Sequence, residues 1–269
     1  MKEKKILRLG ERELQLIFAF EERKQRLFTT KDAKAVLGGT DASVKNVLKR
    51  LKAKRRILHV ERGKYLFAPM ESGKEGLWTE ESLAAVPFLV GGDDYCVGLL
   101  TALNYWGMTE QIPIVVYVIT RKKKKGLEAF GARYVFVNME VGDWVEREFS
   151  GAKVRISSVE QTIIDSLAMP RYALGVAEVA KGINAARKVI DWEKLTRLAR
   201  AGKGVARRRL GFVLETMGLK KQSKALEEKF AGFSWLDPHW EKRRLGYSKK
   251  WGLMLNVPKE DLLEFKNGH

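Results

Sequence analysis

The feature that most constrains the fold of this chain is a pair of glycines followed by one amphipathic helical stripe. Gly38 and Gly39 end the preceding pattern, since glycine adopts left-handed turn geometry at little cost, and Thr40 or Asp41 can then cap a new helix. Apolar residues follow at i, i+3, i+4 and i+7, namely Val44, Val47, Leu48 and Leu51. We therefore expect a helix over residues 41–54 that packs this stripe inward.

The segments on either side of this helix complete a recognisable order of elements. Residues 11–26 indicate a first helix with Leu14, Ile17 and Phe18 on one side, and Thr30 can cap a short second helix. Residues 55–69 alternate apolar and polar side chains, break at Arg62-Gly63-Lys64 and stop at Pro69, which is typical of a two-stranded wing. The order predicts a winged helix-turn-helix.

The charge of the chain points to a polyanionic partner. The sequence holds 51 Lys and Arg against 33 Asp and Glu, a formal net charge of +18. Residues 1–69 alone hold 19 basic and 8 acidic side chains, a net charge of +11. A protein adapted to heat also carries abundant ion pairs, but that explanation accounts for the number of charges and not for their sign. The excess therefore favours nucleic acid as the partner.

The outward face of the 41–54 helix supplies the candidate base contacts. At about 100° per residue, the side chains opposite the apolar stripe are Ala42, Ser43, Lys45, Asn46, Lys49, Arg50, Ala53 and Arg56. In helix-turn-helix proteins the second helix enters the major groove. Asn46 is suited to adenine, Lys49 and Arg50 to guanine or phosphate, and Ala42 to a thymine methyl group.

Three further residues are expected to position the DNA more than to read its sequence. Arg62 and Lys64 flank the glycine of the wing, where a cation can meet a phosphate or enter the minor groove. Thr40 lies where a hydroxyl group and a helix N-terminus can hold a phosphate. We expect their loss to weaken the binding of all sequences alike.

The length of the chain requires a second domain. We predict a DNA-binding domain over residues 1–70, a boundary at 70–75, and a mixed α/β domain over residues 76–269, so that the whole chain is α+β. Helices are expected at 99–106, 158–168, 174–189, 192–201, 205–217 and 259–265, and strands at 113–120, 133–138 and 251–257.

Two runs of cations in the second domain leave alternatives open. Lys122, Lys123 and Lys124 belong to a run that is either a solvated loop tip or an auxiliary phosphate contact. Arg207, Arg208 and Arg209 lie on a predicted helix and are either surface cations or a patch that binds DNA or a partner.

The residues that catalysis would require are poorly arranged. One cysteine, Cys96, and three scattered histidines exclude a disulfide framework and a metal cluster, and no cofactor motif is present. Ser157 followed by Glu160 fits a capping box at the start of a helix better than it fits a catalytic site. We expect a protein that is not an enzyme, and the absence of a signal peptide and of a 20-residue apolar run predicts a cytoplasmic protein without a membrane span.

Several motifs together resemble one protein family. They are TDASVKNVLKRLKAKRRILHVERGKYLFAP (40–69), YCVGLLTALNYWGMTEQIP (95–113), VRISSVEQTIIDSL (154–167), RRRLGFVLETMGL (207–219) and KWGLMLNVP (250–258). In this order they resemble the AbiEi-type antitoxins, predicted transcriptional regulators of viral-defence and type IV toxin-antitoxin loci. Ser158 stands where that family usually has proline.

The resemblance implies more than the residues alone predict. It implies a regulator that binds inverted repeats of double-stranded DNA in its own promoter, and a second domain that opposes a nucleotidyltransferase-like toxin without forming a stable complex with it. Two other readings stay open at this point. One is a nucleic-acid-processing enzyme directed by the winged helix, and the other is an adaptor whose second domain binds a protein.

Overall fold

The chain divides into two units, each described here by itself. The computed structural model describes residues 8–68, 82–129, 132–149 and 152–264. The first unit comprises Met1–Asp93, Gly126–Tyr134 and Glu148–Val154, and the second comprises Asp94–Lys125, Val135–Arg147 and Arg155–His269. The boundary that the sequence predicts at 70–75 lies outside the described residues.

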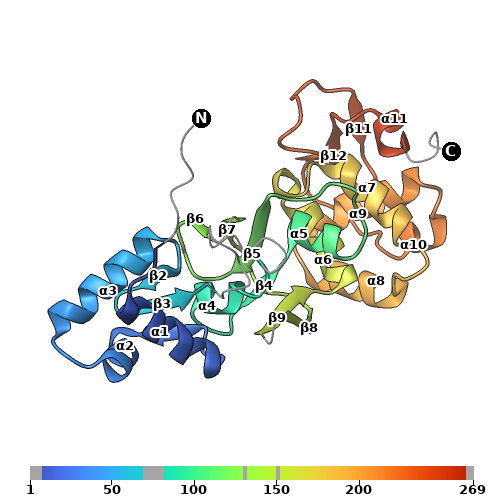
Figure 1. The fold of residues 1–269 in the computed structure, drawn as a ribbon. Helices are drawn as coiled ribbons and strands as arrows, with labels where there is room; N and C mark the ends of the chain where they lie inside the picture. Colours follow the sequence, from blue (N-terminus) through green and yellow to red (C-terminus); the bar gives the residue numbers. More distant parts are fainter. Residues whose placement is uncertain (1–7, 69–81, 130–131, 150–151, 265–269) are drawn as a thin grey trace. The chain divides into compact units, whose positions relative to one another are not determined.

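The first unit begins with three helices, drawn in blue in Figure 1: α1 (Glu11–Glu22), α2 (Thr30–Leu37) and α3 (Asp41–Ala53). The α1 helix ends at Glu22 and is shorter than the sequence predicts. The N-cap of α2 is Thr29, whose hydroxyl accepts from the backbone N–H of Asp32, so the prediction of Thr30 as the cap is wrong by one residue. The N-cap of α3 is Thr40, as the sequence predicts.

A three-stranded sheet accompanies these helices. Its order is β1 (Leu27–Thr29), β3 (Lys64–Phe67) and β2 (Ile57–Glu61), and both neighbouring pairs are antiparallel. Strands β2 and β3 are the predicted hairpin. Strand β1 has three residues and was not predicted, because so short a strand shows no periodicity.

The core of the first unit contains the predicted stripe of α3. Val44, Val47, Leu48 and Leu51 are all buried. The α1 helix contributes Leu16, Ile17 and Phe20, and the ring of Phe20 lies 4.4 Å from that of Phe28 in β1. Phe18, which the sequence places on the inward side of α1, is 60% exposed, so that part of the prediction is wrong.

The chain also forms a six-stranded mixed sheet. Its order is β6 (Leu127–Ala129), β7 (Ala132–Asn138), β5 (Val115–Thr120), β4 (Tyr95–Val97), β9 (Ala152–Ser157) and β8 (Trp144–Phe149). Strand β4 is antiparallel to β5 and parallel to β9. Only β5 and β7 of these strands were predicted.

Most of the remaining helices belong to the second unit. They are α5 (Leu99–Tyr105), α6 (Val159–Ala168), α7 (Val176–Ala185), α8 (Trp192–Ala201), α9 (Gly204–Thr216), α10 (Lys220–Lys224) and α11 (Lys259–Leu262), while α4 (Val86–Val90) belongs to the first unit. The α6 helix is buried from Glu160 to Leu167 and contacts α5, α7, α8 and α9. It is therefore the central helix of the second unit (Figure 1).

A small sheet near the end of the chain completes the second unit. Its order is β10 (Ser234–Trp235), β12 (Leu253–Leu255) and β11 (Gly246–Ser248). Strand β12 lies within the predicted strand 251–257, and Trp251 before it is fully buried. Eleven α-helices and three sheets in the described part of the chain make the fold mixed α+β, as the sequence predicts. Among the described residues, no helix has the length and apolar character needed to cross a membrane.

Candidate nucleic-acid interface

The outward face of α3 is exposed and polar. Because the opposite stripe is buried, Ala42, Lys45, Asn46 and Lys49 all point to solvent. Within the described residues, the structure shows no side-chain hydrogen bond or ion pair for Lys45, Asn46 or Lys49. Their amide and ammonium groups are therefore available to an external partner.

The N-terminus of α3 is held by local hydrogen bonds. The hydroxyl oxygen of Thr40 accepts from the backbone N–H of Ser43 at 3.3 Å, and the hydroxyl of Ser43 donates to the carbonyl of Thr40 at 2.8 Å. Lys34 donates to Asp41 at 2.6 Å, and this hydrogen bond lowers the pKa of the Asp41 carboxyl. Lys34 thereby offsets the one negative charge in the first turn of α3.

Arg50 differs from its neighbours because it forms an ion pair with a buried carboxylate. Its Nε lies 2.9 Å from Oε1 of Glu13, whose side chain is 1% exposed, and Lys54 Nζ lies 2.5 Å from Oε2. Burial acts to raise the pKa of Glu13, but hydrogen bonds from Lys54, the Gly10 backbone and Arg50 lower it overall. Arg50 therefore fixes α3 against α1, and it keeps a half-exposed side chain at the edge of the outward face.

Arg56 is not part of this face. The sequence projection assumes a continuing helix, but α3 ends at Ala53 and the backbone turns at Arg55, where φ is +55°. The Arg56 side chain is 1% exposed and donates to the carbonyl of Ala68 at 3.3 Å. The prediction of an outward Arg56 is therefore wrong.

The turn between β2 and β3 places two cations beside a fixed glycine. Gly63 has φ of +75°, and its carbonyl accepts from the backbone N–H of Thr30 at 2.9 Å, which ties the turn to the start of α2. Arg62 and Lys64 on either side of it are exposed. Both predicted wing cations therefore lie on the surface of the first unit.

The run of cations after β5 is partly engaged within the second unit. Arg121 forms an ion pair with Glu140 at 2.7 Å, and the Lys124 ammonium lies 5.4 Å from the ring centroid of Phe136. Lys122 and Lys123 are exposed. The segment has the features of a loop tip, and an auxiliary phosphate contact there stays a prediction.

The three consecutive arginines of α9 bind carbonyl groups of the second unit. Arg207 donates to Leu226 and pairs with Glu228, and Arg208 donates to Ala231 and Gly232. Arg209 is 4% exposed and donates to the carbonyls of Leu167, Ala168 and Trp235. These contacts attach α9 to its surroundings; Arg209 is buried and Arg207 and Arg208 are half-buried, and a patch there that binds DNA or a partner stays a prediction.

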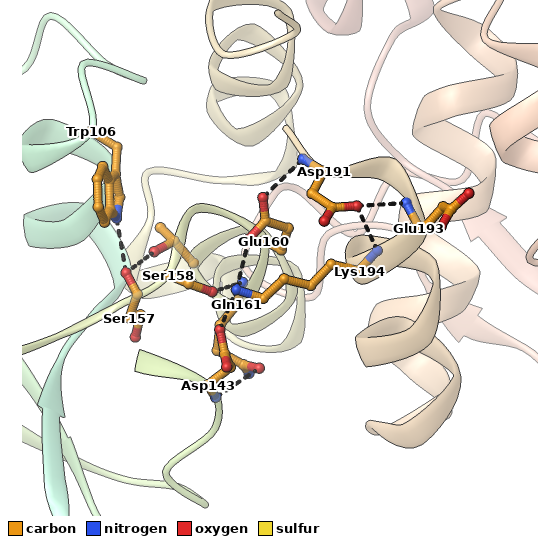
Figure 2. A network of polar contacts seen from close by, with 10 residues as sticks. Trp106, Asp143, Ser157, Ser158, Glu160, Gln161, Asp191, Glu193 and Lys194 are labelled. Carbon is orange, nitrogen blue, oxygen red and sulfur yellow. Dashed lines mark hydrogen bonds and ion pairs between the residues drawn. The ribbon is translucent and has the colours of Figure 1, made fainter. Parts of the chain in front are cut away.

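A polar network at the start of α6 replaces the predicted capping box. Ser158, not Ser157, is the N-cap, because its hydroxyl accepts from the backbone N–H of Gln161 at 3.3 Å. Glu160 accepts from the backbone N–H of Asp191 at 3.0 Å and pairs with Lys194 at 3.3 Å. Figure 2 shows the Lys194 side chain extending from α8 toward Glu160 and Asp143. Glu160 thus joins two helices, and the Ser157–Glu160 capping box is wrong.

A chain of buried polar groups lies behind this network. Ser157 Oγ contacts Cys96 Sγ at 3.2 Å and donates to Asp165 at 3.5 Å, while Gln161 donates to Asp165 at 2.8 Å. Burial raises the pKa of Asp165 to about 7 and that of the Cys96 thiol to about 12. No cluster of metal-ligating side chains occurs among the residues that the structure describes.

A cavity of about 960 Å³ lies along α8 and α10 in the second unit. Its volume is typical of a small-molecule site. Its lining carries both signs of charge, with the cations Arg197, Arg200 and Lys221 and the carboxylates Asp191 and Glu193. Arg200 also donates to the carbonyl of Ala225 at 2.6 Å. The lining therefore favours neither an anionic nor a cationic ligand.

The fold of this chain resembles that of a solved protein structure. The fold is similar to the crystal structure of RV2827C protein from Mycobacterium tuberculosis, with a TM-score of 0.70 and 13% sequence identity. The alignment covers 97% of this chain and 96% of that chain, so the two share a fold over almost their whole length. No protein-family model and no curated protein matches the chain.

Proposed function

We propose that this protein is a transcriptional regulator that binds double-stranded DNA through an N-terminal winged helix-turn-helix. The observation that carries the proposal is the outward face of α3, on which Asn46 and Lys49 are exposed while the opposite stripe is buried. In this unit α2 and α3 form the helix-turn-helix pair, and β2 and β3 form the wing. The local net charge of +11 supports the same partner.

The contacts of each side chain suggest different roles within this interface. Asn46 and Lys49 have the chemistry to read base edges in the major groove. Arg62 and Lys64 of the wing, with Lys45 and the first turn of α3 at Thr40, suit phosphate contacts. Arg50 contributes by holding α3 against Glu13.

Footprinting and binding measurements with single substitutions test the proposal. Asn46→Ala is expected to cost about 1–3 kcal/mol at one operator position and to relax the base preference there. Lys64→Ala is expected to weaken all duplexes alike. Lys188→Ala, which removes an exposed lysine of the second unit, is the matched control and should leave binding unchanged. If Asn46→Ala lowers the affinity for specific and for nonspecific duplexes by the same factor, α3 does not read bases.

We further propose, on the strength of the AbiEi-type resemblance, that the protein represses its own promoter and acts as an antitoxin of a type IV system. The supporting observations are the ordered motifs at 95–113, 154–167 and 207–219, which fall in the second unit except for Val154. Co-expression with a nucleotidyltransferase encoded in the same operon tests this role. Rescue of growth by residues 94–269 without DNA binding would support it, and continued toxicity with the full chain would refute it.

A further inference from the structure

The small sheet of the second unit presents an aromatic face to solvent. Trp235 of β10 and Tyr247 of β11 both pair with Met254 of β12. Side chains of residues paired across neighbouring strands point to the same side of a sheet, so these three share one face. Phe233 precedes Trp235 by two residues, and its ring lies 5.4 Å from that of Tyr247. The face therefore carries three aromatic rings and a methionine.

The opposite face of the same sheet anchors it in the second unit. Leu253 is fully buried in the hydrophobic core, and Leu255 packs against that core. The outer face has no comparable cover, because Phe233 and Tyr247 are each 50% exposed. The rings are thus held in place from behind and remain open in front.

Exposed apolar side chains are concentrated at this sheet. Of the ten large hydrophobic side chains that are exposed in the described part of the chain, four lie between residues 233 and 247: Phe233, Trp240, Leu245 and Tyr247. Scattered exposed apolar residues are ordinary on a protein surface, but a contiguous group of them marks an interaction site.

The segment that carries Tyr247 is rich in cations. The segment 239–250 holds five Lys and Arg against one Glu, and the Arg244 guanidinium lies 5.0 Å from the ring centroid of Tyr247. Lys250 is engaged by Glu215 and Glu227. Lys242, Arg243 and Lys249 are exposed, and the described residues include no ion-pair partner for them. This segment therefore carries a net positive charge, and three of its cations have no ion-pair partner among the described residues.

We propose that this face binds single-stranded nucleic acid, with bases stacked on Phe233 and Tyr247 and phosphates near Arg243 and Lys249. Exposed aromatic rings on a sheet, bordered by cations, match the two requirements of unpaired bases and a polyanionic backbone. The stacked interior of a duplex does not offer its bases to such rings. The positive charge disfavours a neutral or basic protein surface, and the combination of rings and cations favours unpaired bases on a phosphate backbone. The site is independent of the α3 interface.

Fluorescence anisotropy of the full chain tests the proposal with labelled oligo(U) and oligo(dT) of about 20 nucleotides, longer than one stacking site requires. The double variant Phe233→Ala/Tyr247→Ala is expected to bind single strands about 10-fold to 100-fold more weakly. Tyr247→Phe keeps the ring and should stay within about 2-fold of the parent protein. Ile112→Ala/Ile114→Ala removes exposed apolar groups elsewhere in the second unit and is the matched control.

A second variant keeps the test decisive if the double alanine variant fails to fold. Arg243→Gln/Lys249→Gln leaves the rings intact and should reduce the salt dependence of single-strand binding by about 1.4 in log–log slope. Unchanged single-strand affinity in both variants, or no binding by the parent protein, would overturn the proposal. Self-association in sedimentation that Tyr247→Ala abolishes, without single-strand binding, would assign the face to a second copy of the chain. Asn46→Ala should weaken only duplex binding, so this proposal and the regulatory one fail separately.

Discussion

At the scale of single residues, Asp165 is the group whose environment most affects its chemistry. Burial raises its pKa to about 7, although hydrogen bonds with Gln161 and Ser157 act to lower it. A carboxyl group whose folded pKa exceeds its unfolded pKa binds its proton more tightly in the folded state. The stability that this proton contributes is complete below about pH 4 and is lost as the pH rises through about 7.

Asp165→Asn should therefore remove a decline in stability between about pH 4 and about pH 7. The free energy of unfolding of the variant, relative to that of the parent protein, is expected to rise by about 1–3 kcal/mol between pH 5 and pH 8, because asparagine has no proton to lose. Thermal unfolding at the two pH values measures the difference. Asp143→Asn is the contrasting variant, since hydrogen bonds from Lys194 and Ser158 outweigh burial and lower the pKa of Asp143. Equal shifts at both pH values would show that Asp165 does not titrate in this range.

Several residue-level predictions succeeded or failed for a clear physical reason. The Thr40 cap and the buried stripe of α3 follow from helical geometry alone, and both are confirmed. The burial of Arg56 could not be foreseen, because the turn at Arg55 that redirects its side chain depends on the packing of β2 and β3. The choice of Ser158 over Ser157 as a cap depends on where β9 ends, and Ser157 is that strand's last residue.

At the scale of elements, α9 depends on one buried guanidinium. Arg209 donates to the carbonyls of Leu167 and Ala168 at the end of α6 and to that of Trp235 in β10. Burial lowers its pKa to about 10, which still leaves it charged at neutral pH. It therefore joins three elements of the second unit through hydrogen bonds that no other side chain at this position can reproduce.

Arg209→Met is expected to lower the free energy of unfolding by about 3 kcal/mol, because it leaves buried carbonyl groups without donors. Urea unfolding of the full chain provides the measurement. Arg208→Met is the matched control on the same helix, since its carbonyl partners Ala231 and Gly232 lie in exposed contacts and can bond to water. Comparable losses in the two variants would contradict the structural role assigned to Arg209.

The sequence predicts those helices and strands whose pattern of apolar and polar residues extends over at least one full helical or strand period. The helices α3, α6, α8 and α9 and the strand β5 belong to this class, although boundaries shift by a few residues. Strands β4, β10 and β11 have two or three residues and form only because distant segments pair with them. The aromatic face of the small sheet could not be predicted from the sequence for the same reason, because it depends on the register of three such short strands.

At the scale of the whole molecule, the positive charge is divided between two surfaces of different chemistry. The α3 face combines amide and ammonium groups on a helix, which suits the major groove of a duplex. The small sheet combines aromatic rings with cations, which suits unpaired bases. The first surface belongs to the first unit and the second to the second unit, so a fragment can separate the two proposed binding activities.

A fragment of residues 1–75 is expected to fold and to bind duplex DNA but not to prefer single strands. Its hydrophobic cluster, from Leu16 to Phe67, lies wholly inside the fragment, so the core does not require the second unit. Because domains of this size are marginally stable, its thermal midpoint should be lower than that of the full chain. Circular dichroism and anisotropy with labelled duplex measure both properties. A fragment that is unfolded would show that Gly126–Tyr134 and Glu148–Val154 are needed by the first unit.

The salt dependence of duplex binding then shows whether the first unit supplies all of the phosphate contacts. The log–log slope changes by about 0.9 for each phosphate neutralised, so equal slopes for the fragment and the full chain are expected if Lys122, Lys123 and Lys124 make no phosphate contact. The ion pair of Arg121 with Glu140 and the position of Lys124 over Phe136 favour that outcome. A slope steeper by about 2 or more in the full chain, and restored by changing the three lysines to glutamine, would instead establish the auxiliary contact.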